Sequence, residues 1–262
     1  MTTMVLAVRD SATMTRRSFR HVLRSPSSLL VSVAIPVLLL LLFIGVFGGA
    51  LKAGLGAVSH GSYIDYLLPG IIVIAAVYGC QITTLAVNQD SSAGVIARFR
   101  TMPISPSSML NGYAAGALVR TLVSMALVIG VAIGLGFRPT AGAGGWLAAA
   151  GVIILFVLAL TWLAVGSGLA AKGPEGTIGF LLVVQMLPFI SSAFVPPGQM
   201  SAPVRWFAAH QPFTQVIDTL RGLLTGAPLP GATVLAAVAW CAGLALAGYL
   251  WARALSRRDL NR

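Results

Sequence analysis

Two lysines are the residues to test first for nucleotide chemistry, because a phosphate-binding loop ends in Gly-Lys followed by Ser or Thr. Lys52 follows Leu51, and Lys172 follows Ala171. Neither lysine therefore has the glycine that lets such a loop wrap around a phosphate. We expect the chain not to bind ATP by this route.

The sequence also gives little support for acid–base catalysis or for metal binding. The three histidines are scattered along the chain: His21, His60 and His210. Cys80 and Cys241 have no metal-type spacing, and no paired carboxylates or serine elbow accompany them. We therefore expect no catalytic residue, no metal site and no cofactor bound by this chain. An intramembrane lipid-modifying enzyme remains the least favoured alternative.

A few polar residues interrupt long apolar stretches and are candidates for contact with a transported molecule. They are Gln81, Asn88, Gln185, Ser191 and Ser192. Polar groups in a membrane span line a pathway or hydrogen-bond between helices. The sequence leaves both readings open.

The elements that must position these residues are predicted from charge distribution. Hydrophobic residues make up 57% of the chain and charged residues only 9%, against about a quarter charged in soluble domains. Long uncharged stretches separate the charges, such as the 33 residues between Arg138 and Lys172. A helix needs about 20 apolar residues to cross a bilayer. We therefore predict an all-α integral membrane protein with six transmembrane helices at residues 29–48, 66–87, 109–137, 146–170, 177–194 and 233–251.

The basic residues predict the orientation of these spans. Of the 17 Lys and Arg, twelve fall in the N-terminal segment, the second and fourth inter-span connections or the C-terminal tail. By the positive-inside rule these segments, and both termini, are cytoplasmic. The net charge of +11 thus orients the chain in a lipid bilayer rather than binding nucleic acid. Residues 1–26 have the basic amphipathic pattern of a helix lying in the membrane interface.

The cytoplasmic loop 90–106 contains a candidate docking helix. Val95, Phe99 and Met102 fall at helical spacing, and Arg98 and Arg100 flank them. A short amphipathic helix of this kind suits a groove on a partner protein. The alternative is a connector whose arginines serve only to orient the membrane protein.

The exterior segment 195–231 is predicted to contain two short helices, one over 203–209 and one beginning at Pro212. In the second, an apolar stripe accompanies Asp218 and Arg221, which are spaced as an i,i+3 ion pair. The segment is too short and too charged to span. We expect exterior or re-entrant helices, with a simple interfacial cap as the alternative.

No predicted span contains Asp or Glu, so the carboxylates that relay protons in carriers are missing. A transporter without an energy source of its own requires a partner. We therefore expect a separate subunit to supply the energy.

Two motifs, on opposite predicted sides of the membrane, resemble the type-2 permeases of ABC exporters, and specifically the daunorubicin-resistance branch. The cytoplasmic motif comprises Asp90, Gly94, Arg98, Met102, Pro103, Ile104 and Ser105. The exterior motif comprises Met200, Pro203, Trp206, Pro212, Thr214, Arg221, Leu223, Leu224 and Gly226. The resemblance covers essentially the whole chain.

The resemblance implies a permease homodimer, or a heterodimer with a related permease, above two ABC ATP-binding subunits that bind ATP and Mg. Residues 1–26 would form the connecting helix. The ATPase would couple through Asp90, Gly94, Val95, Arg98, Phe99, Arg100, Met102 and Pro103. It further implies export of a hydrophobic drug, lipid or glycolipid across a bacterial cytoplasmic membrane. Polysaccharide export is the alternative within the same family.

Overall fold

The computed structural model describes residues 26–47, 63–93 and 106–258, and these residues form helices without strands. The long elements are α2 (Pro26–Leu42), α4 (Tyr63–Ser92), α6 (Pro106–Gly134), α7 (Ala143–Ala170) and α11 (Gly231–Arg258). The shorter ones are α8 (Glu175–Met186), α9 (Ala202–His210) and α10 (Pro212–Thr225). A π-helical turn, Phe43–Phe47, extends α2, and Pro197–Gln199 forms one 3₁₀ turn. The predicted interfacial helix at 1–26 lies almost wholly outside the described residues.

Four of the described helices are long and apolar enough to cross a membrane: Tyr63–Ser92, Leu110–Gly134, Ala143–Ala170 and Gly231–Ser256. Two shorter apolar helices, Ser32–Val46 and Glu175–Met186, accompany them. Together they make an all-helical, multi-pass membrane architecture. The count of six crossings stays a prediction.

The four long helices overlap the predicted spans 66–87, 109–137, 146–170 and 233–251, but most of them extend further. α4 has 30 residues and is therefore about 45 Å long at 1.5 Å per residue. The hydrocarbon core is only about 30 Å thick. Hydropathy marks the apolar middle of a helix and not the turns that continue into the interface, which explains the difference.

The fifth predicted span, 177–194, differs most from the structure. α8 begins at Glu175 and ends at Met186, and turns replace the helix through Phe194. Pro188 has no N–H and its ring clashes with the preceding helical turn. The turns that follow α8 bring Ser192 against α10, where it contacts Thr214 and Asp218.

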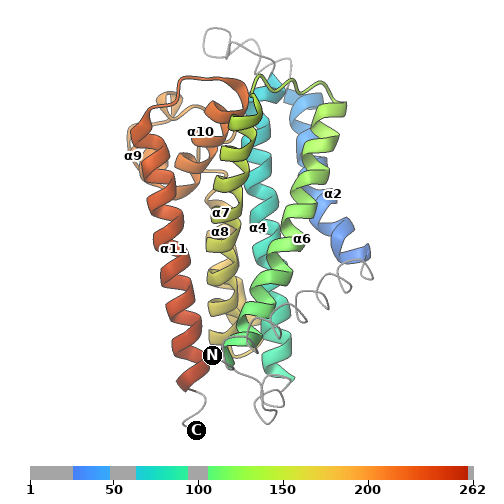
Figure 1. Ribbon diagram of the computed structural model, residues 1–262, viewed down its shortest axis with the longest axis vertical. Helices are drawn as coiled ribbons and strands as arrows, with labels where there is room; N and C mark the ends of the chain where they lie inside the picture. The colour runs from blue at the N-terminus through green and yellow to red at the C-terminus, as the bar shows by residue number, and fades with distance from the viewer. Residues whose placement is uncertain (1–25, 48–62, 94–105, 259–262) are drawn as a thin grey trace.

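α4 lies at the centre of the bundle, and its N-terminal half is almost fully buried, including Leu67, Leu68, Ile71 and Ile72. Figure 1 shows α2, α4, α6, α7 and α11 running along the long axis, with α9 and α10 gathered at one end. α7 packs along α11 and α4, while α6 and α2 cover another side of α4. We call the end that carries α9 and α10 the outer end.

Helices approach closely where glycine faces a neighbouring backbone or ring. A Cβ atom on Gly168 of α7 would lie 2.7 Å from the carbonyl oxygen of Thr84 on α4. On the other side of α7, a Cβ on Gly166 would lie 2.6 Å from the ring of Trp251 on α11. Small residues permit this spacing, because association inside a membrane depends on close van der Waals packing. α7 is thereby held between α4 and α11.

Candidate functional site

Helix α10 is tied to the bundle through a polar cluster around Arg221. Arg221 Nη1 donates to Asp218 Oδ1 at 2.6 Å, which confirms the i,i+3 pair. Its Nη2 donates to the carbonyl oxygen of Ser192 at 2.7 Å and to that of Tyr66 at 3.3 Å. The Arg221 side chain is only 14% exposed. The guanidinium therefore connects α10, the turns after α8 and the first turn of α4.

Tyr66 and Ser192 complete this cluster. The guanidinium carbon of Arg221 lies 3.9 Å from the centre of the Tyr66 ring, which is a cation–π geometry. Tyr66 Oη donates to the Ser192 carbonyl oxygen at 3.1 Å, and Ser192 Oγ donates to Asp218 Oδ1 at 2.7 Å. Thr214 Oγ1 accepts the Ser192 backbone N–H at 3.3 Å. We call Tyr66, Ser192, Thr214, Asp218 and Arg221 the outer clamp.

The local sequence explains why α10 presents these groups. Pro212 stands at the first position of the helix, where its missing N–H costs no hydrogen bond. Gly226 ends the helix with φ of 69°, a left-handed conformation that glycine adopts without strain. The apolar stripe faces inward and is fully buried: Val216, Ile217, Leu220 and Leu224. The predicted amphipathic helix is confirmed, with Asp218 and Arg221 beside the buried stripe.

α9 is the first of the two predicted exterior helices, and it too is present. Pro203 lies in its first turn. Trp206 is 68% exposed and its ring stacks on His210, with centroids 5.0 Å apart. Trp206 therefore faces away from the bundle, unlike Asp218 and Arg221.

Of the candidate pathway residues, Gln81 and Gln185 meet directly. Gln185 Nε2 on α8 donates to Gln81 Oε1 on α4 at 2.6 Å. Both side chains are half-buried. The pair links two helices and leaves one donor hydrogen on Gln185 and the amide of Gln81 for another partner. This geometry fits both the interhelical and the pathway reading, so the pathway role stays a prediction.

The other candidate pathway residues lie apart from this pair. Asn88 is buried near the inner end of α4, where its Nδ2 donates to the carbonyl oxygens of Gly168 and Ala171 at 3.2 and 2.9 Å. Ser191 is buried, and its hydroxyl donates to the Pro188 carbonyl oxygen. Ser192 belongs to the outer clamp. The five residues thus form three separate groups and not one continuous lining.

Asp90 is the one predicted coupling residue within the described part of the chain. It lies in the last turns of α4 and not in a loop, and it accepts a hydrogen bond from Tyr113 Oη on α6. The hydroxyl of Tyr113 thereby connects the inner ends of α4 and α6. The remaining predicted coupling residues lie outside the described residues: Gly94, Val95, Arg98, Phe99, Arg100, Met102 and Pro103.

Sequence reasoning missed Tyr66, Thr83 and Tyr113 as partners of charged residues. Tyr66 and Arg221 are 155 positions apart, and no spacing rule relates residues so far apart. A tyrosine at the predicted edge of a span was the available signal, since tyrosines concentrate at membrane interfaces. That signal places the ring at an interface but does not identify the cation it meets.

The comparison with known families decides the class of protein. The family model described as "ABC-2 type transporter" matches residues 10–225. The chain belongs to the ABC-2 transporter family. This permease is therefore a membrane transport subunit that works with an ATP-binding subunit, as the sequence motifs suggested.

Curated relatives agree with this assignment. The chain is 31% identical over 210 residues to "Daunorubicin resistance ABC transporter permease protein DrrB1" of Streptomyces coeruleorubidus, covering 80% of this chain and 71% of the relative. It is 24% identical to "Probable doxorubicin resistance ABC transporter permease protein DrrC" of Mycobacterium tuberculosis, covering 91% and 85%. It is 26% identical to "Putative transport permease ycf38" of Porphyra purpurea, covering 82% and 73%.

Proposed function

We propose that this permease exports a hydrophobic drug, lipid or glycolipid from a bacterial cell, driven by a separate ATP-binding subunit present in two copies. The observation that carries the proposal is the match over most of the chain to a permease named for daunorubicin resistance. The sparse charge of the predicted spans agrees with an apolar cargo. Two permease chains, identical or related, enclose the pathway in the cytoplasmic membrane.

The direction of transport follows from the proposed orientation. Loop 90–106 lies on the cytoplasmic side, where ATP is available, and the outer clamp lies on the exterior side. Since α10 is amphipathic and anchored by Arg221, it is suited to closing the exterior end of a pathway while the ATPase rests. No observation on the described residues favours polysaccharide export over this proposal.

The test is reconstitution of the permease with its ATP-binding subunit in proteoliposomes. We expect ATP-dependent accumulation of doxorubicin, or of a fluorescent phospholipid, in inside-out vesicles. The permease alone should neither hydrolyse ATP nor move either compound under an imposed proton gradient. ATP hydrolysis or proton-driven uptake by the permease alone would contradict the proposal, as would absence of transport of both compounds by the complete complex.

A further inference from the structure

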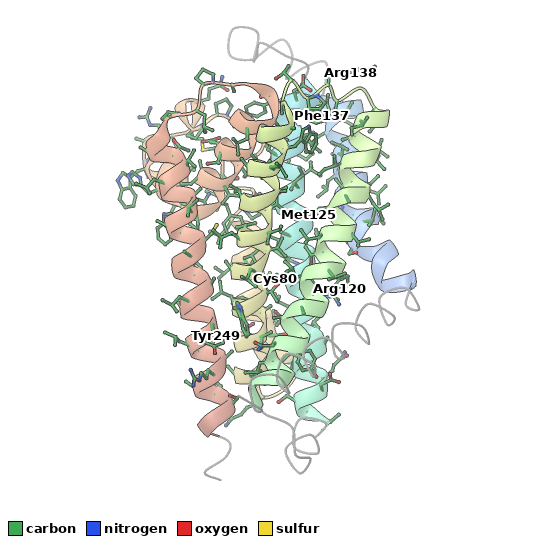
Figure 2. The ribbon with its side chains drawn as sticks, viewed as in Figure 1. Cys80, Arg120, Met125, Phe137, Arg138 and Tyr249 are labelled. Carbon is green, nitrogen blue, oxygen red and sulfur yellow. The ribbon has the colours of Figure 1, made fainter. Side chains whose placement is uncertain are left out.

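Arg120 is a charged residue at the centre of a membrane-spanning helix. α6 runs from Pro106 to Gly134, so 14 helical residues separate Arg120 from either end. One turn further along α6, Ser124 Oγ donates to the carbonyl oxygen of Ser32 at 3.1 Å, so Arg120 lies level with the first turns of α2. Figure 2 labels Arg120 on α6, below Met125 and toward the end of the bundle opposite α9 and α10.

The guanidinium turns toward α4 and is only partly hydrogen-bonded. Arg120 Nη2 donates to Thr83 Oγ1 at 2.8 Å. Thr83 is buried, and its own hydroxyl donates to the carbonyl oxygen of Gly79 at 2.7 Å. Arg120 Nε is buried without a partner. Thr83 thus fixes the guanidinium in one place, and the other N–H donors of Arg120 have no hydrogen-bond partner among the described residues.

No described carboxylate neutralises Arg120. Asp218 pairs with Arg221, which is the one ion pair formed within the described residues. Asp90 accepts from Tyr113 near the inner end of α4. Asp65 stands in the first turn of α4, 18 residues before Thr83, and Glu175 stands in the first turn of α8 with no ion pair to Arg120. Buried charges are usually paired, and Arg120 has no counter-charge among the described residues.

We propose that Arg120 is an anion site, which binds the phosphate group of an amphiphile where α6 packs against α4. The phosphate takes the donors that Thr83 leaves free, in the charge-assisted hydrogen bonds that guanidinium makes with phosphate oxygens. Thr83 is a positioning residue, because it holds the guanidinium and has no donor left for the ligand. The apolar part of the amphiphile lies among the surrounding apolar helices.

A phosphate of this kind has two sources, a phospholipid of the bilayer and an exported amphiphile. The chemistry at Arg120 is the same for both. The second source rests on the proposed function, whereas the first does not. The binding experiments below use the permease without its ATPase, so their failure is independent of any failure to transport.

The first arm asks whether bilayer lipid occupies the site. Wild-type permease is extracted from membranes containing phosphatidylglycerol and weighed by native mass spectrometry. We expect one phosphatidylglycerol to stay on each wild-type permease and to be lost from Arg120→Gln. Arg138→Gln, which removes the same charge from an exposed position between α6 and α7, is the matched control and should keep the lipid.

The second arm asks whether a mobile amphiphile binds. Permease in phosphatidylcholine nanodiscs is titrated with dodecyl phosphate and with uncharged dodecanol, and empty nanodiscs are subtracted. Hydrogen bonds to charged groups make wild type bind dodecyl phosphate about tenfold more tightly than Arg120→Gln does. The preference for dodecyl phosphate over dodecanol should vanish in Arg120→Gln and return in Arg120→Lys.

Thr83→Val separates the anion site from a merely structural link between α4 and α6. It removes the hydrogen bond to Arg120 but keeps the charge, so it should retain most of the preference for dodecyl phosphate. If the link alone matters, Thr83→Val and Arg120→Gln will lose stability equally and neither will change the preference.

Success in the first arm alone assigns the site to bilayer lipid, and success in the second arm alone assigns it to a mobile amphiphile. The proposal is overturned if Arg120→Gln retains phosphatidylglycerol and also keeps the preference for dodecyl phosphate. If Arg120→Gln does not fold, the binding measurements on the wild-type permease test the proposal by themselves. Equal binding of dodecyl phosphate and dodecanol by wild type, with no retained phosphatidylglycerol, overturns the proposal.

Discussion

Arg221 of α10 stacks on the ring of Tyr66 at the start of α4, with 3.9 Å between the guanidinium carbon and the ring centre. The same guanidinium donates to the backbone carbonyl oxygen of Tyr66. Both the ring and the backbone carbonyl oxygen of Tyr66 thus contact the Arg221 guanidinium. This contact fixes α10 to α4, the most buried of the long helices.

Replacing Arg221 by Ala should loosen the outer clamp. The change leaves Asp218 unpaired and removes two carbonyl contacts, and because Asp218 is 36% exposed we discount the loss to about 2 kcal/mol. Asp218→Asn should cost less, since its amide oxygen can still accept from Ser192. Thermal melting of the purified permease measures both. Arg205→Ala, at an exposed arginine of α9, is the control, and an Arg221→Ala variant that melts with it would show that the clamp does not anchor α10.

The hydrogen bond between Gln81 and Gln185 should make the effects of replacing the two residues on stability non-additive. Gln185→Leu leaves the Gln81 amide without its partner and should destabilise the permease by about 1 kcal/mol. The double variant Gln81→Leu/Gln185→Leu removes both polar groups and should recover most of that loss. A double-mutant cycle on melting temperatures measures the coupling, which averages about 0.6 kcal/mol in membranes. Additive losses would mean that the two side chains act independently.

Two glycines of α7 offer a matched comparison of packing. Gly168→Ala places a Cβ 2.7 Å from a backbone oxygen of α4, an atom that cannot swing aside, so it should cost about 1–3 kcal/mol. Gly151→Ala, on the same helix, meets nothing within 4 Å and should be neutral or stabilising by up to about 1 kcal/mol. Denaturation of both variants in the same detergent measures the difference in their stability. Equal stability would indicate that α7 and α4 are less closely packed than described.

The coupling hypothesis is tested at Phe99, which lies outside the described residues. If Val95, Phe99 and Met102 fill a groove on the ATPase, Phe99→Asp buries an unpaired charge there and weakens association by several kcal/mol. The permease should reach the membrane at normal levels yet fail to co-purify with its ATPase or to stimulate ATP hydrolysis. Arg98→Ala should cost about 1 kcal/mol or less. Unchanged complex formation by Phe99→Asp would leave loop 90–106 as a basic connector only.

The proposed orientation places the end that carries α9 and α10 outside the cell. In a Cys80→Ala/Cys241→Ala background, Gln199→Cys should react with an impermeant thiol reagent added to intact cells. Ser92→Cys, at the exposed inner end of α4, should react only after the membrane is opened. Both positions are exposed, so access alone separates them. Labelling of position 199 from the cytoplasmic side only would reverse the topology.

Local rules recovered those features that depend on residues close together in sequence. Charges are excluded from hydrocarbon, so uncharged stretches located the helices that became α4, α6, α7 and α11. The helical repeat related Asp218 to Arg221, and Pro212 and Gly226 marked the ends of α10. Each of these inferences compares residues within one helix, where geometry is fixed by 3.6 residues per turn.

Tertiary packing decided the rest. Pro188 ends α8, while Pro36 and Pro69 lie inside α2 and α4, so a proline alone does not say where a helix stops. The sequence shows an arginine at position 120, but not that Thr83 holds it against α4 or that Arg221 stacks on the ring of Tyr66. Those contacts depend on which helix faces are brought together across the bundle, and that arrangement is set by the combined packing of all the helices.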